Sequence, residues 1–138
     1  TSTSGKRFLW NLYNQVDRRV QSKEGGSHTY STTTWRQYGA DAAMDCEFIQ
    51  GLALAKIQVT VRAQMAVGGT YSYLAAGLDT TTTNTDYTAI GAVSTDTLVG
   101  VTVDIASPTV GYHYMSLNQI AQSSTAYNFG AVLVTLPC

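Results

Sequence analysis

Hydrophobic and polar residues alternate most regularly between Lys56 and Val67. Odd-numbered positions are apolar and even-numbered positions are mostly polar, which is typical of a strand with one buried face. The apolar set is Ile57, Val59, Val61, Ala63 and Met65, and the opposite set is Lys56, Gln58, Thr60, Arg62 and Gln64. A helix would also gather several of these apolar residues on one side, but their β-branched character favours a strand.

Similar patterns predict about seven further short strands. We expect them at His28–Gln37, Cys46–Leu54, Thr70–Leu78, Tyr87–Val93, Leu98–Ile105, Gly111–Ala121 and Tyr127–Leu136. Gly68-Gly69 is expected to form a two-residue hairpin turn that makes Lys56–Val67 and Thr70–Leu78 partner strands. Short strands at even spacing predict a sandwich or barrel, and we expect an all-β fold, a jelly-roll-type β-sandwich with an extended N-terminal arm.

The arm is expected to span residues 1–26, ahead of a sandwich domain at residues 27–138. Lys6–Val20 fits a short helix or an extended segment, and Gly25-Gly26 permits a turn after it. The residues expected to anchor the arm on a larger particle are Phe8, Leu9, Trp10, Leu12 and Tyr13. Folding back onto the sandwich would also bury these side chains, so both arrangements stay open.

The amino-acid composition favours an oligomer over a single-copy domain. The chain has 138 residues, enough for one domain, and only 12% of them are charged. So few charges favour burial of surface against other copies of the chain. A surface rich in Thr and Ser could instead keep a monomer in contact with water. All eight Lys and Arg residues lie within residues 1–63. This is either chance or a sign that the two halves face different surroundings.

Several classes of function lack their sequence signature. The sequence has no basic stripe with interleaved aromatic residues, so we do not expect nucleic-acid binding. It also has no apolar run that is long enough for membrane insertion. Cys46 and Cys138 are the only cysteines, without a metal-binding spacing, so we expect no metal and no cofactor. Cys46 is most simply a small buried residue, and a bond to Cys138 is possible but not required.

The candidate acids are Asp41, Asp45 and Glu47. Asp45 and Glu47 are two residues apart and share a face of the expected strand, as paired catalytic carboxylates must share a cleft. A solvated strand end explains them equally well, so we do not expect an enzyme. His113 falls among apolar neighbours and is interpreted as a hydrogen-bonded core or interface residue.

Tyrosine is enriched, with nine residues. Its rings combine apolar area with a hydroxyl group, which suits subunit interfaces and platforms for sugars. The residues predicted to form an oligomer interface or a glycan contact are Tyr71, Tyr73, Tyr112, His113 and Tyr114. Ordinary packing on a half-buried strand face is the alternative.

Five segments resemble a family of small structural proteins of tailed bacteriophages and phage-derived particles. They are Leu12–Val16, Tyr30 with Thr34–Gln37, Glu47–Ala53, Gly77–Thr81 and Val110–Tyr114, in the order of that family. The resemblance implies a location in the virion, often as a trimeric jelly roll at a capsid vertex or fibre tip. We therefore expect a non-enzymatic homotrimer that binds capsid or other virion proteins and contacts a host surface glycan. A lectin-like glycan-binding module is the alternative, and a small glycosidase or lyase is a third.

Overall fold

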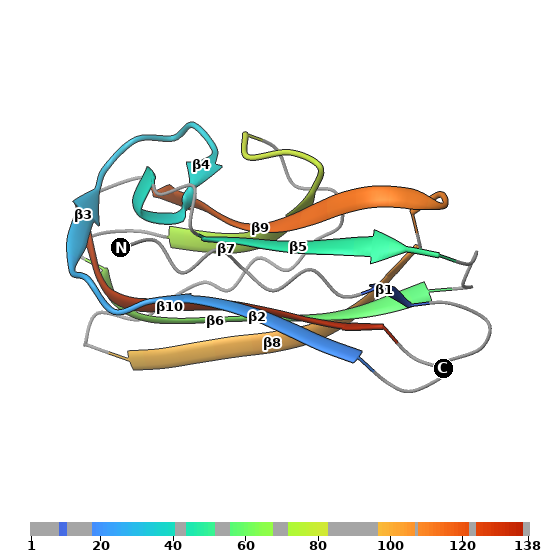
Figure 1. Ribbon diagram of the computed structural model, residues 1–138. Coiled ribbons are helices and arrows are strands. Elements are labelled where there is room, and N and C mark those ends of the chain that lie inside the picture. Colours follow the sequence, from blue (N-terminus) through green and yellow to red (C-terminus); the bar gives the residue numbers. More distant parts are fainter. Residues whose placement is uncertain are drawn as a thin grey trace.

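The computed structural model of the chain consists of two β-sheets packed face to face (Figure 1). It describes residues 9–10, 18–40, 44–51, 56–67, 72–82, 97–106, 108–121 and 124–136. The strands are β1 (Leu9–Trp10), β2 (Arg18–Glu24), β3 (His28–Tyr30), β4 (Arg36–Gln37), β5 (Asp45–Gln50), β6 (Lys56–Val67), β7 (Ser72–Leu78), β8 (Thr97–Ala106), β9 (Gly111–Ala121) and β10 (Thr125–Leu136), with a 3-10 turn, η1, at Tyr38–Ala40. Within these ranges no helix is long and apolar enough to cross a membrane. The expected all-β sandwich is confirmed.

Strand β9 is the centre of the first sheet, which forms the upper layer in Figure 1. Strands β5 and β4 pair antiparallel with successive parts of one edge of β9, and β7 pairs antiparallel with its other edge. Strand β1 adds to β5 in parallel, with Leu9 opposite Ile49. Three strands thus depend on β9 for their place in this sheet.

Strand β10 is the centre of the second sheet. Strands β2 and β3 pair antiparallel with successive parts of one edge of β10, and β6 pairs antiparallel with the other edge. Strand β8 completes the sheet beyond β6. In Figure 1 these strands form the lower layer, so β10 lies under the first sheet along its length.

Successive strands from β5 to β10 alternate between the two sheets. This corrects the expected hairpin at Gly68-Gly69, because β6 pairs with β10 and β8 whereas β7 pairs with β9. Both strands have one apolar face, and placing them in opposite sheets turns those two faces toward a common core. The Gly-Gly pair itself lies outside the described residues.

The core lies between the sheets and contains the apolar face of β6 as predicted. Ile57, Val59, Val61, Ala63 and Met65 are each at most 1% exposed. Val59 and Val61 lie opposite Val134 and Val132 of β10, and Phe48, Leu74, Met115 and Leu117 come from the first sheet. Full burial of each large side chain stabilises the fold by about 1.5–3 kcal/mol, so one register of β6 is strongly preferred.

Other expected elements have different bounds in the structure. The strand expected at His28–Gln37 is two short strands, β3 and β4, separated by a bend at Thr33 and Thr34. The two belong to different sheets, so the chain must turn between them. The strand expected at Cys46–Leu54 begins at Asp45 and ends at Gln50. The expected strand Tyr87–Val93 lies outside the described residues.

Two segments of the expected N-terminal arm pair with the sandwich. Leu9–Trp10 forms β1 beside β5, and Arg18–Glu24 forms β2 along β10, with Val20 3% exposed in the core. Phe8, Leu12 and Tyr13 lie outside the described residues. The range expected to reach off the domain thus contributes a strand to each sheet.

Candidate functional site

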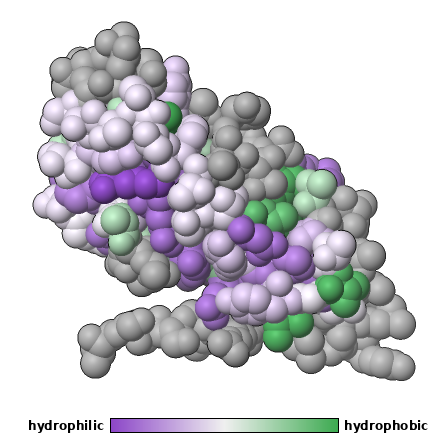
Figure 2. Space-filling model, turned by 90° about the horizontal axis from the view of Figure 1, so that it is seen from above, coloured by the Kyte–Doolittle hydropathy of each residue, from purple (hydrophilic) through white to green (hydrophobic). Residues whose placement is uncertain are grey.

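The outer surface of the first sheet brings together carboxylates and tyrosines. Cys46 and Phe48 of β5 and Met115 of β9 point into the core, so by strand alternation the residues between them point outward. We call this surface the acidic face, formed by Asp45, Glu47, Ile49, Tyr73, Tyr112 and Tyr114. Figure 2 looks onto this side and shows hydrophilic residues running across it, with most of the hydrophobic surface toward the end where β5 ends and β9 begins.

Three of the predicted tyrosines therefore share one surface, and Tyr71 lies outside the described residues. Tyr112 is 52% exposed, whereas Tyr73 and Tyr114 are half-buried. Tyr114 lies opposite Glu47, and Tyr112 lies opposite Ile49. Tyr112 and Glu47 are thus diagonal neighbours, close enough for long side chains to act together.

The acids on this face influence each other and the nearby phenol. Partial burial raises the pKa of Asp45 to about 6, and the negative charge of Glu47 adds to the rise. Burial also raises the pKa of Tyr114, helped by the charges of Asp45 and Asp79. Gln37 Nε2 donates to Asp45 Oδ1 at 2.8 Å. The third candidate acid, Asp41, lies outside the described residues.

His113 points into the sandwich, as interpreted from its apolar neighbours. It is 9% exposed, and its ring lies against Phe48 with 5.9 Å between ring centroids. Its Nδ1 lies 2.7 Å from Asp79 Oδ2 and its Nε2 lies 2.7 Å from the carbonyl oxygen of Thr109. A neutral imidazole has one N–H, so both hydrogen bonds exist together only in the protonated ring.

Asp79 extends the pairing of β7 and β9 beyond the end of β7. Its backbone N–H donates to the carbonyl of Tyr114 at 2.9 Å, and Tyr114 N–H donates to Asp79 Oδ1 at 3.0 Å. Asp79 has a φ of 55°, a left-handed conformation that aspartate tolerates better than most residues. One side chain therefore joins the loop to both the backbone and the histidine of β9.

The loop that follows folds back over the outer side of β9. Ser116 Oγ donates to the carbonyl of Thr80 at 2.6 Å, and Asn118 Nδ2 donates to the same oxygen at 3.2 Å. The close approach requires Gly77, because a Cβ there would lie 2.3 Å from both Asn118 Nδ2 and Thr80 O. The first residues of the polar loop expected at Asp79–Thr85 are thus held against β9 by hydrogen bonds. The residues after Thr82 lie outside the described residues.

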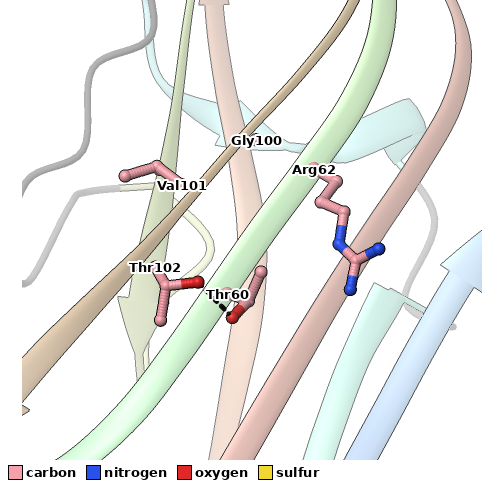
Figure 3. A pocket seen from close by; sticks show the side chains of 5 residues that line it. All are labelled: Thr60, Arg62, Gly100, Val101 and Thr102. Atoms are coloured by element: carbon pink, nitrogen blue, oxygen red, sulfur yellow. Dashed lines mark hydrogen bonds between the residues drawn. The ribbon is translucent and has the colours of Figure 1, made fainter.

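The outer surface of the second sheet carries a shallow hollow between β6 and β8 (Figure 3). It measures about 370 Å³ and is lined by Thr60, Arg62, Gly100, Val101 and Thr102. Gly100 lies opposite Arg62, and the Arg62 side chain lies over it, since a Cβ at position 100 would be 2.9 Å from Arg62 Cγ. The hydroxyls of Thr60 and Thr102 lie 2.7 Å apart and form one wall.

We call this surface the basic face because of the charges around the hollow. Its outward charged side chains among the described residues are Arg19, Lys23, Lys56, Arg62 and Asp104. Asp104 forms an ion pair with Lys56, and the hydrogen bond from Lys56 lowers the pKa of Asp104. Leu98, which lies opposite Gln64, is 66% exposed on the same face.

Sequence reasoning missed a cluster of rings that connects the two sheets near β3. His28 stacks on Tyr127 at 5.0 Å and meets the edge of Tyr38 at 4.7 Å. Tyr38 donates to the carbonyl of Phe129 at 2.7 Å, and burial raises its pKa. No local signal could have found this contact, because Tyr38 and Phe129 are 91 positions apart.

A second layer of polar contacts surrounds these rings. The guanidinium of Arg36 lies 3.8 Å from the centre of the Tyr30 ring. With its amide oxygen toward Arg36, Gln119 accepts from Arg36 Nε at 3.0 Å and donates to His28 Nε2 at 3.0 Å. Arg36 is thus engaged inside the sandwich and does not contribute charge to the acidic face.

Cys46 is a buried thiol, as predicted. It is 1% exposed, is not in a disulfide, and its Sγ lies 3.2 Å from the carbonyl oxygen of Val132. Burial raises its pKa to about 12. Cys138 lies outside the described residues.

The described residues offer two surfaces of opposite charge and one histidine held between two acceptors. No group of three or more His, Cys, Asp or Glu side chains in this part of the chain could hold a metal ion. A scan against models of known protein families found no match to the sequence. A search of curated proteins also found no match.

Proposed function

We propose that this chain is a non-enzymatic virion surface protein that forms an oligomeric capsid spike, decoration or fibre head and contacts the host surface. The order of the strands is the observation that carries the proposal. Strands β2, β10, β6 and β8 are neighbours in one sheet, and β5, β9 and β7 are neighbours in the other. This order, with successive strands in opposite sheets, supports a jelly-roll arrangement, an architecture common in viral capsid and lectin domains.

The segments that carry the phage resemblance support the same proposal by where they lie. Glu47–Ala53, Gly77–Thr81 and Val110–Tyr114 are far apart in sequence. They supply Phe48 and Asp79, both of which contact His113 at the end of the first sheet. A shared local structure at this point would explain why these segments are the ones that resemble that family.

The proposed assembly is a homotrimer, because the chain is poor in charge and has exposed apolar residues on both outer faces. Stable contacts need about 800 Å² of surface on each partner. Light scattering at micromolar concentration should give three times the mass of the chain. A single monomeric species would contradict the proposal.

A glycan-binding role is the second candidate, and the acidic face favours it. An exposed Tyr112 ring beside the carboxylate of Glu47 combines a stacking platform with hydrogen-bond acceptors for sugar hydroxyls. If this is the main function, Tyr112→Ala should abolish binding to a glycan array and leave particle attachment unchanged.

The test of the proposal is reconstitution on particles that lack the protein. Purified chain mixed with such particles should co-sediment and saturate at a fixed number of copies, whereas heat-unfolded chain should not. Folded chain that stays in the supernatant at all concentrations would contradict the proposal. Imaging of the decorated particles would then give the site of attachment.

The arm can be tested in the same assay. Because β2 begins at Arg18, a truncation that removes residues 1–17 keeps this strand and its pairing with β10. If Phe8, Leu9, Trp10, Leu12 and Tyr13 anchor the protein, the truncated chain should remain folded and oligomeric but no longer co-sediment. Normal decoration by the truncated chain would contradict the anchoring role.

A further inference from the structure

The ring of His113 joins two separate loops at one end of the first sheet. Its Nδ1 lies 2.7 Å from Oδ2 of Asp79, in the loop after β7. Its Nε2 lies 2.7 Å from the carbonyl oxygen of Thr109. Thr109 belongs to the entry loop, residues 108–110, which leads into β9. We call these two contacts the latch, because they tie the entry loop to the loop after β7.

The latch needs two hydrogens on one ring. A carboxylate and a carbonyl oxygen only accept hydrogen bonds, so each of the two contacts requires an N–H from His113. The ring has two N–H groups when it is protonated and one when it is neutral. A neutral ring keeps its hydrogen on Nδ1, because the bond to the charged carboxylate of Asp79 is the stronger one. The lone pair of Nε2 then faces the lone pairs of the Thr109 oxygen, and this contact becomes repulsive.

The surroundings of the ring leave the proton balance to Asp79. Phe48 of β5 lies opposite His113 and contributes an apolar ring, and Gln50, farther along β5, is a buried neutral amide. Among the described side chains, the charged group in contact with the ring is the carboxylate of Asp79. The titratable groups that alternate with these residues on β5 and β9 point to the outer side of the sheet. They are Asp45, Glu47 and Tyr114.

The entry loop is built to move when it is released. Val110 is 62% exposed, so the loop carries an apolar side chain into solvent. Gly111, which follows it, has a φ of 148°, a conformation that residues other than glycine rarely adopt. A Cβ there would approach only Nε2 of His113, at 3.8 Å. The backbone at Gly111 can therefore rotate and carry the entry loop away from the ring.

We propose that the protonation state of His113 sets the conformation of the entry loop. The protonated ring holds Asp79 and Thr109 together and keeps the loop closed. When the ring loses its proton, Nδ1 stays bonded to Asp79, the bond to Thr109 is lost, and the loop moves away at Gly111. The exposed Val110 is thus presented in one way in acid and in another way at higher pH. The latch is a property of the isolated chain and stands apart from the proposed virion role.

Solution NMR of the full chain labelled with 13C and 15N tests the latch between about pH 5 and 9, the range in which histidine acts as a switch. The ring 15N signals report the proton count and the tautomer of His113. The 13C signal of the Thr109 carbonyl reports its hydrogen bond. Both should shift with the same midpoint, and the neutral ring should carry its hydrogen on Nδ1. A constant Thr109 signal, or a ring that keeps one protonation state throughout, would overturn the proposal.

Variants separate His113 from the other titrating groups. His113→Gln should abolish the pH-dependent step in the Thr109 signal. His28→Gln is the matched control, because His28 is the only other histidine, and it should leave the step unchanged. Asp45→Asn should also leave the step unchanged, although Asp45 has a pKa of about 6 and lies opposite Ser116 on β9. Loss of the step in either control would assign the switch to another group and overturn the latch.

Asp79→Asn keeps the test decisive if His113→Gln does not fold. The amide retains an oxygen that accepts hydrogen bonds but lacks the negative charge that favours a protonated ring. The ring signals and the Thr109 signal should therefore move together to lower pH. A Thr109 step that stays in place while the ring signals move would overturn the latch. Such a failure would leave the proposed function standing, because attachment to particles is measured separately.

Discussion

His113 Nδ1 and Asp79 Oδ2 form a hydrogen bond at 2.7 Å, although 34 positions separate the two residues in the chain. Asp79 Oδ1 also accepts the backbone N–H of Tyr114, so this one side chain holds two partners on β9. The pair therefore fixes the loop after β7 against the start of β9.

Asp79→Ala should lower the free energy of unfolding by about 2–3 kcal/mol. The change removes both hydrogen bonds and places a residue with poor tolerance for the left-handed conformation at a φ of 55°. Urea titration at neutral pH measures the loss. Asp79→Asn is the control, because it tolerates this conformation and keeps an acceptor, so its loss should be clearly smaller.

Gly77→Ala should destabilise the protein by about 1–3 kcal/mol. Its Cβ would overlap Asn118 Nδ2 and Thr80 O, each 2.3 Å away, and both atoms are held in the contact between the loop and β9. Gly25→Ala is the matched change, since nothing lies within 4 Å of a Cβ at that position. Equal melting temperatures for the two variants would contradict the assigned packing.

Val61→Asp should prevent folding, because Val61 is 1% exposed in the core and a buried charge has no partner there. Gln58→Asp makes a comparable change on the exposed side of the same strand and should be tolerated. Soluble expression and a cooperative thermal transition are the measurements. A Val61→Asp chain that melts cooperatively would refute the assignment of the β6 faces.

Asp45 should make the protein less stable as the pH rises from about 4 to 6. Its pKa in the folded chain, about 6, lies above the usual value, so the folded state binds the proton more tightly than the unfolded state. The stabilisation is complete below the unfolded pKa and disappears above pH 6. Its size is about 1–2 kcal/mol, allowing for solvent screening of a partly exposed group.

Urea titrations across this pH range test the effect of Asp45 against two variants. Asp45→Asn keeps the acceptor for Gln37 and should remove the decline. Asp104→Asn is the comparison of opposite sign, because the pKa of Asp104 is lowered and its contribution is lost as the pH falls. An unchanged decline in the Asp45→Asn chain would contradict the prediction.

Cys46 should not react with thiol reagents while the protein is folded. Its pKa of about 12 leaves almost no thiolate at neutral pH, and the side chain is 1% exposed. Measurement in a Cys138→Ser background counts this thiol alone. Labelling should appear only with unfolding by denaturant, and rapid labelling of the native chain would show that the site is accessible.

The sequence predicted the fold best where the signal is local. Alternation over Lys56–Val67 identified the buried face of β6, and the apolar neighbours of His113 identified its inward position. The prediction of a hairpin at Gly68-Gly69 was wrong, because a glycine pair indicates a turn but does not indicate which sheet the next strand joins. Sheet membership depends on the pairing of β7 with β9, whose residues come more than thirty positions later.

The candidate site was predictable only in part for the same reason. Alternation placed Asp45 and Glu47 on one face, and the spacing of Tyr112 and Tyr114 placed both on one side of β9. The hollow beside Arg62 depends on Gly100 lying opposite it, and this register is set across two strands. Neither the contact of Asp79 with His113 nor the stacking of His28 on Tyr127 has a local signature.

The position of β9 and β10 at the centres of their sheets has a consequence during synthesis on the ribosome. Every other described strand except β1 and β8 pairs directly with one of these two, and they are the last two strands to emerge. Among β2 to β8 only β6 and β8 pair with each other in the described residues, so the apolar faces of the other strands stay uncovered until β9 and β10 are available. The nascent chain is exposed to aggregation over this interval, and a variant that lacks β10 should lack the template on which the second sheet assembles.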